Sequence, residues 1–271
     1  MANLFADGFE SGDLTAWSSS STDGGDLSAA TAAKLHGNYG LNCLIDDTTD
    51  MYVRDDTPNG ETRYRIRFYV DINSLVMANN NEFLIFRAIR TSTGKQGFSV
   101  NVKYTTVAGY IIYVGVRHDD LSYEYITANG VTDALHCVEV DWKASSGVGN
   151  NDGFCSLWID GILIGTISNV DNDIFIMDYA NLGVIGKPSG TSGTLFLDDF
   201  QSNNDGGAIG MVDFTYVGTG EFAYSGEATQ TYTFNYLCVA NVGFNYSGSA
   251  ICDYTINHFQ YFYRNKKRIY C

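Results

Sequence analysis

The stretch FCSLWIDGILIGTI, Phe154–Ile167, decides the fold. Two apolar runs stand on either side of Asp160-Gly161, a dipeptide that readily adopts the positive φ angles of a tight turn. Strand-like runs joined by such a turn predict an antiparallel β-hairpin. The preceding run HCVEVDWK, His136–Lys143, alternates apolar and polar residues with a period of two, which is typical of a half-buried strand.

Similar runs recur along the chain with turn signals between them. They are RYRIRFYV (63–70), EFLIFRAIR (82–90), GFSVNVKY (97–104), YIIYVGVRH (110–118) and GTLFLDDF (193–200). The 271 residues include 29 Gly, 19 Tyr and 16 Phe but only 2 Pro, a composition that favours strands and turns over helices. Strands at this spacing predict an all-β double-sheet jelly roll or sandwich.

The polar, glycine-rich stretch QSNNDGGAIG, Gln201–Gly210, interrupts this pattern. Beyond it the sequence repeats, because FTYVGTGEFAYSGEA (Phe214–Ala228) is similar to FNYLCVANVGFNYSGSA (Phe234–Ala250). We therefore predict a jelly-roll domain over 1–203, a linker over 204–210 and a small domain of β-hairpin repeats over 211–271. Isolated hairpins are marginally stable in water, so we expect the small domain to pack on the jelly roll, on a second copy of itself across a symmetry axis, or on another protein.

Composition excludes several classes of function. A net charge of −15 argues against nucleic acid as a partner, and no apolar run reaches the 18 residues of a membrane span. The start, Met1-Ala-Asn-Leu-Phe, has no feature of a signal peptide, so we expect synthesis in a cytoplasm. The six cysteines form no C-x-x-C motif and are expected to be buried thiols, with a Cys238–Cys252 pair as the alternative in an oxidising compartment.

The stretch LHCVEVDWKASSGVGNNDGFCSLWIDGILIGTISNVDND (Leu135–Asp173) resembles the concanavalin A-like lectin/glucanase (laminin-G-like) jelly rolls of bacteria and phages. So do GFESGDLTAW, YVRDDTPNGETRYRIRFYVD and GTSGTLFLDDF, and together the resemblance covers roughly residues 3–203. It implies a concanavalin A-like jelly-roll β-sandwich. The C-terminal repeats resemble aromatic and glycine-rich β-repeats of phage structural proteins.

The resemblance also implies that the first and last strands of the jelly roll lie side by side. Carboxylates near both ends, Glu10 with Asp198 or Asp199 and with Asp7 as a spare, would then share a cation. Calcium suits such a site because it takes several oxygen ligands. We therefore expect a structural calcium ion at these four residues. In the alternative interpretation the same acids cap turns and solvate an edge strand.

The resemblance further implies which residue pattern an enzyme of this fold would carry. Glycosidases of this fold carry E-x-D-x-E on one strand, whereas EVDWK has Glu139 and Asp141 but Lys143 in the last position. Hydrolysis needs two carboxylates at a fixed separation, so we interpret these residues as a charged ladder on an exposed strand face. The four histidines are scattered, and His118 beside Asp119 is the one candidate for a lyase base. We expect no enzymatic activity.

Binding of a sugar requires an aromatic platform. Most aromatic residues are expected in the core, including Trp158, which we predict between the two sheets. Tyr123 and Tyr125 in DDLSYEYIT are the best platform residues, and His118 is the third candidate of this carbohydrate-binding set.

These observations lead us to expect a non-enzymatic, virion-associated surface protein, either a capsid decoration or a tail-associated subunit, whose jelly roll binds carbohydrate. A dedicated glycan-binding adhesin is the alternative, and a polysaccharide lyase or glycoside hydrolase ranks last. The expected partners are other virion subunits, contacted through the repeats of a homo-oligomer, and cell-surface glycans. No nucleic acid or membrane is expected.

Overall fold

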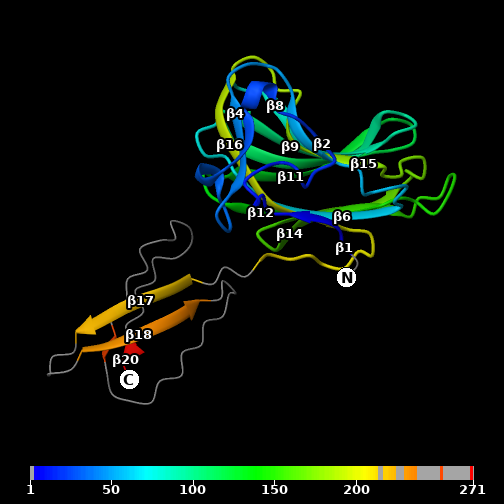
Figure 1. Cartoon of the computed structure of the whole chain (residues 1–271). Helices are drawn as coiled ribbons and strands as arrows, with labels where there is room; N and C mark the ends of the chain where they lie inside the picture. The colour runs from blue at the N-terminus through cyan, green and yellow to red at the C-terminus, as the bar shows by residue number, and fades with distance from the viewer. Residues whose placement is uncertain (1–2, 213–215, 224–228, 237–250, 253–268, 271) are drawn as a thin grey trace. The chain divides into compact units, whose positions relative to one another are not determined.

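The computed structural model describes residues 3–212, 216–223, 229–236, 251–252 and 269–270 (Figure 1). The chain divides into two compact units, Met1–Val212 and Asp213–Cys271. Unit 1 is a sandwich of two antiparallel sheets, so the predicted all-β class and jelly-roll architecture are confirmed. Its helical content among these residues consists of two short 3₁₀ turns, Asp23–Gly25 (η1) and Thr31–Ala33 (η2). In the described part of the chain, no helix has the length and hydropathy that a bilayer span requires.

The first sheet, sheet A, contains the hairpin that opened the sequence analysis. Its strand order is β14 (Ile162–Val170), β13 (Gly153–Ile159), β12 (His136–Lys143), β6 (Arg63–Asp71), β16 (Thr191–Asn203), β4 (Gly40–Ile45) and β3 (Leu27–Ala30). Two further strands, β1 (Asn3–Asp7) and β7 (Val76–Met77), also pair with β16. The pairing of β1 with β16 puts the start and the end of the jelly roll side by side, as expected.

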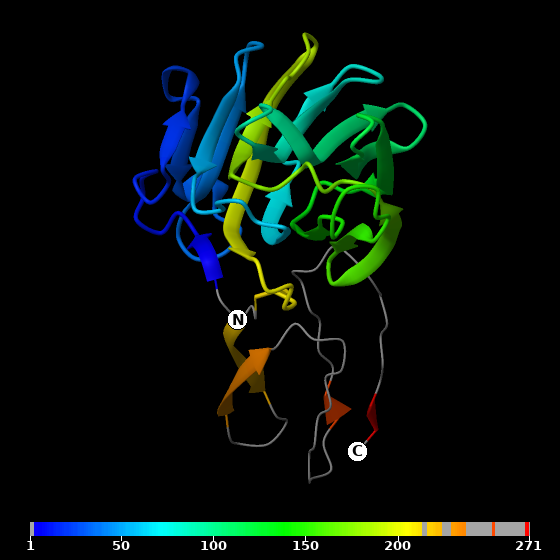
Figure 2. The ribbon, with the colours of Figure 1, turned by 90° about the vertical axis from the view of Figure 1, so that its right-hand side faces the viewer.

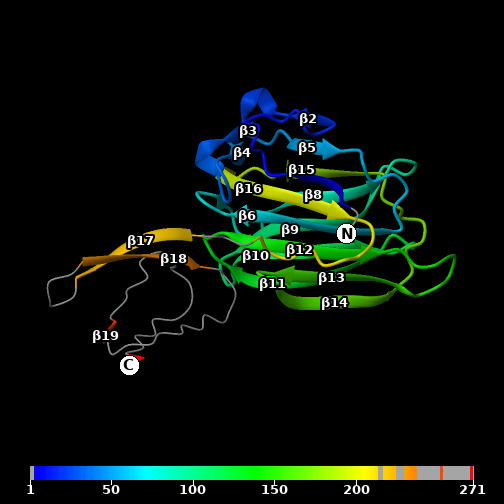
Figure 3. The same ribbon diagram turned by 60° about the horizontal axis from the view of Figure 1, so that its bottom comes forward.

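The second sheet, sheet B, faces sheet A across the core (Figure 3). Its strand order is β11 (Tyr123–Val131), β10 (Gly109–Arg117), β9 (Lys95–Thr105), β8 (Glu82–Arg90), β15 (Tyr179–Ile185), β5 (Met51–Asp55) and β2 (Ser19–Ser21). Every neighbouring pair is antiparallel, and the chain crosses repeatedly between the sheets (Figure 2).

Aromatic rings fill the space between the sheets. Phe68 of sheet A stacks on Phe86 of sheet B with centroids 6.2 Å apart, and Phe98 lies 6.0 Å from Trp142 of sheet A. All four side chains are fully buried, and each such burial stabilises the fold by roughly 1.5–3 kcal/mol. Cys43, Cys137 and Cys155 are buried free thiols, and burial raises the pKa of Cys137 to about 12.

Trp158 departs from its predicted place. It lies opposite Glu139 on β12 and Leu163 on β14, on the face of sheet A that points away from the core. The guanidinium of Arg65 lies over its ring at 4.7 Å, and the side chain is half-buried. The prediction that Trp158 packs between the sheets was therefore wrong. The ring is covered by a cation on the outer face of sheet A instead.

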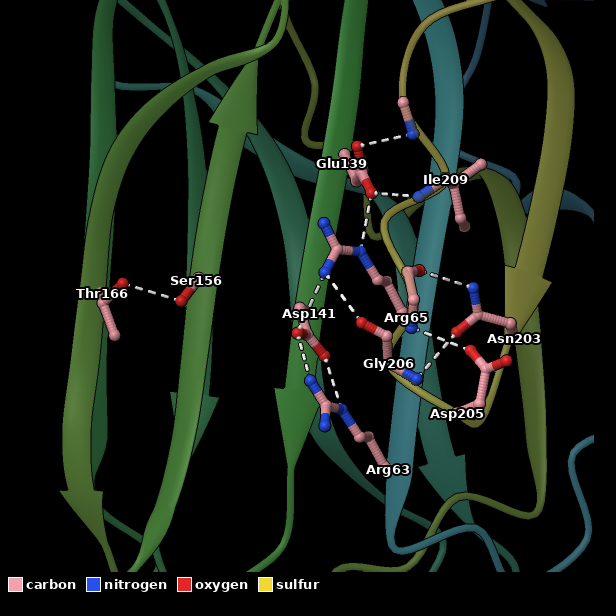
Figure 4. A network of polar contacts seen from close by, with 12 residues as sticks. Arg63, Arg65, Glu139, Asp141, Ser156, Thr166, Asn203, Asp205, Gly206 and Ile209 are labelled. Carbon is pink, nitrogen blue, oxygen red and sulfur yellow. Dashed lines mark hydrogen bonds and ion pairs between the residues drawn. The ribbon is translucent and has the colours of Figure 1, made fainter. Parts of the chain in front are cut away.

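Unit 1 continues past the predicted domain end at residue 203 and reaches Val212. Residues 204–212, which we call the strap, do not form the predicted free linker. The strap lies against the outer face of sheet A, where Glu139 accepts the backbone N–H groups of Ile209 at 2.8 Å and Gly210 at 3.1 Å (Figure 4). Arg65 donates to the Gly206 carbonyl at 3.2 Å. The charged residues of β12 were predicted to lie on an exposed strand face, but the strap covers Glu139 and Asp141, and both are buried.

Four charged side chains beneath the strap form one network. Arg65 contacts Glu139 at 2.6 Å and Asp141 at 3.1 Å, and Arg63 contacts Asp141 at 2.7 Å (Figure 4). Both carboxylates are buried, with 6% and 4% of the residue surface exposed. Buried charges need partners of this kind because desolvation would otherwise cost several kcal/mol each. These acids are therefore committed to holding the fold together.

In unit 2, β17 (Tyr216–Ala223) and β18 (Thr229–Tyr236) form an antiparallel hairpin, and two short strands, β19 (Ile251–Cys252) and β20 (Ile269–Tyr270), pair with each other. β17 lies within the first predicted repeat, but β18 begins after that repeat ends at Ala228 and reaches into the second, so this hairpin does not coincide with the first repeat. Most of the second repeat, and Cys238 of the predicted cysteine pair, lie outside the described residues.

Candidate functional site

The outer face of sheet B carries a row of mostly polar residues that extends over six strands and ends at a tyrosine. The register aligns Arg54 on β5, Asn181 on β15, Arg87 on β8, Ser99 on β9, Gly115 on β10 and Tyr125 on β11. Because side chains alternate between the two faces of a strand, the residues between these positions, such as Val100 and Val114, fill the core. We call this surface the polar face.

Arg87 lies near the middle of the polar face. In the amide orientation that satisfies both of its ends, Asn181 accepts a hydrogen bond from Arg87 Nη2 at 3.1 Å. The guanidinium also lies over the ring of Tyr52, 5.8 Å from its centroid. Asn181 is buried, whereas Arg87 is half-buried and keeps part of its surface accessible. The contacts orient a cation that still reaches solvent.

A short chain of hydrogen bonds continues the polar face beyond Arg87. Asn101 donates to Ser99 Oγ at 3.0 Å, and Gln96 approaches the same oxygen at 3.4 Å. Ser99 and Asn101 are only 2% and 7% exposed although both point away from the core. Buried polar groups of this kind hold their neighbours in fixed positions because leaving them unpaired would be costly.

Tyr113 lies directly opposite Asn101 across β9 and β10. Its hydroxyl is hydrogen-bonded to Glu82, which also accepts a 3.0 Å contact from Lys103. Burial raises the pKa of Tyr113 above that of a free phenol, and the Glu82 carboxylate adds to the shift. The Tyr113 hydroxyl is therefore neutral at ordinary pH and bonded to a group that can accept its proton.

Tyr125 covers the end of the polar face and is 58% exposed. Its ring stacks on Tyr123 at a centroid distance of 6.1 Å and meets Tyr113 edge-on at 5.6 Å. The ring lies so close to Gly115 that a Cβ there would come within 3.2 Å of it. Glycine at this position lets the ring lie flat on the sheet, so the three tyrosines form one aromatic cluster.

The structure brings together two of the three predicted carbohydrate-binding residues. Tyr123 and Tyr125 belong to the aromatic cluster of the polar face, whereas His118 does not. His118 Nε2 lies 3.2 Å from Glu124, which is opposite Val116, a core residue. His118 therefore lies on the other side of sheet B. The assignment of Tyr123 and Tyr125 to sugar binding stays a prediction.

The predicted calcium ligands are engaged by hydrogen-bond donors. Asp198 accepts the N–H groups of Leu35, His36 and Asp199, while Glu10 accepts those of Asn38 and Tyr39. These donors point positive hydrogens at the oxygens that a cation would need. The other two predicted ligands, Asp7 and Asp199, also have hydrogen-bond donors or cationic partners.

Asp7 accepts the Phe9 N–H at 3.0 Å and the Trp17 indole N–H at 2.7 Å. Asp199 pairs with His36 at 3.0 Å and with Arg67 at 3.6 Å. The four carboxylates thus fit turn capping and ion pairing, the alternative interpretation, better than they fit calcium. The stretch GFESGDLTAW contacts the last strand of the jelly roll through Trp17, whose ring lies 5.3 Å from that of Phe200 on β16.

Two other groups of carboxylates lie close enough to share a cation within the described residues. They are Asp23 with Asp46 and Asp47, and Asp119 with Asp171 and Asp173. Burial and the Asp173 carboxyl raise the pKa of Asp119 to about 6. Exposed acidic groups of this kind are common without a bound ion.

Sequence analysis missed the cations and amides of the polar face. The signal was present in GFSVNVKY, where Ser99, Asn101 and Lys103 alternate with buried residues. Polar residues on one face of a strand usually indicate solvent, so the pattern did not separate a site from an ordinary surface. The distinguishing fact is the burial of Ser99, Asn101 and Asn181, which the sequence does not reveal.

No protein-family model matches the chain, and no curated protein matches it. Its fold is similar to solved structures. An endo-β-1,4-glucuronan lyase from the fungus Trichoderma reesei is 14% identical with a TM-score of 0.53, over 75% of this chain and 96% of the lyase. An alginate lyase is 13% identical with a TM-score of 0.50, over 67% and 87% of the two chains.

A third similar structure is the binding domain of Paraclostridial Mosquitocidal Protein 1, which is 11% identical with a TM-score of 0.51. The match covers 74% of this chain but about half of that domain, 48%. At these identities the likeness shows the jelly-roll β-sandwich fold alone.

The comparisons correct the predicted function. A non-enzymatic virion-associated surface protein was expected, but the similar structures include two polysaccharide lyases and a toxin binding domain. Two of these three similar proteins are lyases, the class of protein that the sequence analysis ranked last.

Proposed function

We propose that unit 1 is a polysaccharide lyase that binds uronic-acid polymers across the polar face of sheet B. The observation that carries the proposal is the oriented pair of Arg87 and Asn181, with Tyr113 two strands further along the same face. A cation, amides and a phenol on adjacent strands are the groups that elimination next to a carboxylate requires.

Arg87 would receive the carboxylate of the sugar. An arginine fork binds a carboxylate through two parallel hydrogen bonds, and such charge-assisted bonds are about twice as strong as neutral ones. Neutralising that carboxylate acidifies the adjacent C–H group. Because the chain carries a net charge of −15, an anionic polymer needs such a local concentration of cations in order to approach.

Tyr113 would carry the proton. Its oxygen removes the hydrogen next to the sugar carboxylate while Glu82 takes the phenolic proton through the hydrogen bond between them. A carbon–carbon double bond forms, and the bond to the leaving sugar oxygen breaks. The proton that Tyr113 has taken up then passes to that oxygen, and Glu82 returns the phenolic proton to Tyr113. The raised pKa of Tyr113 suits the first step because it makes the oxygen a stronger base toward the C–H hydrogen.

Tyr125 and Tyr123 would support the polymer next to the cleaved unit. Tyrosine rings present an apolar body with a polar tip, which suits the faces and hydroxyl groups of sugars. The 58% exposure of Tyr125 leaves its ring accessible to such a ligand.

Incubation of the full chain with glucuronan, with alginate and with a neutral β-glucan tests the proposal. Lyase action creates an unsaturated uronate, so ultraviolet absorbance should rise with an acidic polymer and stay flat with the neutral one. Tyr113→Phe should abolish the rise. Tyr104→Phe, on the core-packed side of β9, is the matched control and should retain it. No absorbance change with either acidic polymer, together with measurable binding to one of them, would reduce the function to carbohydrate binding.

A further inference from the structure

Lys187, two residues after the end of β15, is the one buried lysine in the described part of the chain. Its side chain is 0% exposed, and its Nζ contacts the carbonyl of Thr49. Two carboxylate oxygens, Asp23 Oδ2 and Asp47 Oδ1, each lie 3.7 Å from the same nitrogen. A buried ammonium group carries a large desolvation penalty, so these contacts are needed to keep it charged.

The two carboxylates differ in their surroundings. Asp23 lies in η1 with its side chain 15% exposed, and burial together with the nearby Asp47 carboxylate raises its pKa. Asp47 is 54% exposed, and hydrogen bonds from the Thr49 N–H and hydroxyl lower its pKa. One oxygen of each of these two carboxyl groups lies within 4.8 Å of the other. Of the two groups, Asp23 is therefore the more readily protonated and Asp47 the more readily ionised.

We propose that Lys187 and Asp23 form an intramolecular isopeptide bond, with Asp47 as the proton-transfer group. A shielded amine beside a carboxylic acid and a second carboxylate is the combination that amide formation requires. The proposal is independent of the function assigned to the polar face, since these residues lie in the β2–β3, β4–β5 and β15–β16 connections.

The bond-forming step balances without an outside reagent. Asp47 takes a proton from the Lys187 ammonium, and the neutral amine attacks Cγ of the protonated Asp23. One further N–H proton moves through Asp47 to the Asp23 hydroxyl, which leaves as water. The products are a neutral amide, one water molecule and protonated Asp47, which returns its proton to solvent. No atom changes its oxidation state.

Two physical effects favour this reaction. Holding the two groups in contact replaces an encounter in solution by an intramolecular step, which is worth about 7–11 kcal/mol of barrier in well-oriented cases. The product also removes a buried charge, because the neutral amide needs less solvation than the ammonium ion that it replaces. The bond would fix the β2–β3 connection to the β15–β16 connection.

Intact-mass spectrometry of the full chain after denaturation tests the proposal. The expected mass is that of the sequence less one water. Aspartyl-glycine sequences such as Asp23-Gly24 lose the same mass when they form a succinimide, so a proteolytic map must show a branched peptide that contains both residue 23 and Lys187. Lys187→Met and Asp23→Ala should restore the full mass. Asp46→Ala, an exposed neighbour, is the control and should keep the loss.

The wild-type chain alone decides the question, even where a variant fails to fold. A full sequence mass after prolonged incubation of the folded protein overturns the proposal, and so does a lost water without a branched peptide. If the cross-link is present, Asp47→Ala should slow its formation, so that the unlinked mass is seen in freshly made protein.

Discussion

Glu139 accepts the backbone N–H of Ile209 at 2.8 Å, and this contact fastens the strap onto sheet A. The same carboxylate accepts the Gly210 N–H and the Arg65 guanidinium, so one buried side chain joins a strand, a neighbouring strand and the segment that leads to unit 2. The strap is consequently a structural part of the sandwich. Without the strap, the charged network beneath it would be exposed to solvent, and Glu139 would lose two of its hydrogen-bond donors.

Glu139→Gln tests this role. In the glutamine variant an amide nitrogen, which donates, would replace one of the accepting carboxylate oxygens. Arg65 would also lose the negative charge of Glu139. Breaking a buried pair in this way costs about 3–5 kcal/mol. We expect a loss of that order in the free energy of unfolding measured with urea, whereas Glu124→Gln, whose side chain is 55% exposed, should change it by less than about 0.5 kcal/mol. Equal effects of the two substitutions would contradict a structural role for the strap.

The position of the strap could not be predicted from the sequence, although the strands could. Alternation in HCVEVDWK and the Asp160-Gly161 turn were sufficient to predict strands, a hairpin and the all-β class, because these depend on local periodicity. The strap has no periodicity. Its position follows from backbone N–H groups that meet a side chain some 70 residues away in the sequence, and no local pattern in Gln201–Gly210 encodes that meeting.

Asp198 should make the stability of the chain depend on pH. Its side chain is fully buried, and burial raises its pKa from 3.8 to about 7. The folded state therefore holds this proton more tightly than the unfolded state does. The favourable contribution is fully present below about pH 4 and is lost as pH rises towards 7, a change of about 4 kcal/mol for three pKa units.

Asp198→Asn isolates that contribution because asparagine is a neutral side chain of the same shape. Urea unfolding at several values between about pH 4 and pH 7 should show the wild type losing stability relative to the variant as pH rises. The difference between the two curves matters, since other carboxylates titrate in both proteins. Parallel curves over this range would show that Asp198 is ionised in the folded state, held by its three N–H donors.

Chelation provides a third test. Glu10, Asp7, Asp198 and Asp199 already accept N–H donors or pair with cationic side chains, so a divalent cation would have to displace those contacts. We expect EDTA to leave the melting temperature of the full chain unchanged, and added calcium to leave it unchanged as well. A lower melting temperature with EDTA that calcium restores would instead demonstrate a stabilising cation in the protein.

The polar face was only partly predictable for a different physical reason. Tyr123 and Tyr125 were found from their place in a polar turn region, but Arg87 and Asn181 lie 94 residues apart in the sequence, within otherwise apolar runs. Their contact depends on the order of strands in sheet B, where β8 lies between β9 and β15. Strand order across a sandwich is set by the whole topology and not by any one run.

Arg87→Lys is the sharpest test of how the polar face recognises its ligand. Lysine keeps the positive charge but loses the planar fork, so a purely electrostatic surface would tolerate the change while a carboxylate site would not. We expect affinity for an acidic polymer, measured by calorimetry at fixed salt, to fall at least about tenfold, which corresponds to about 1.4 kcal/mol. Arg54→Lys, at the other end of the polar face, is the comparison: Arg54 is already paired with Asp56 at 2.6 Å, so its substitution should lower affinity less than Arg87→Lys does. If both substitutions leave affinity unchanged while raised salt abolishes binding, the face attracts polyanions through charge alone and Arg87 recognises no carboxylate.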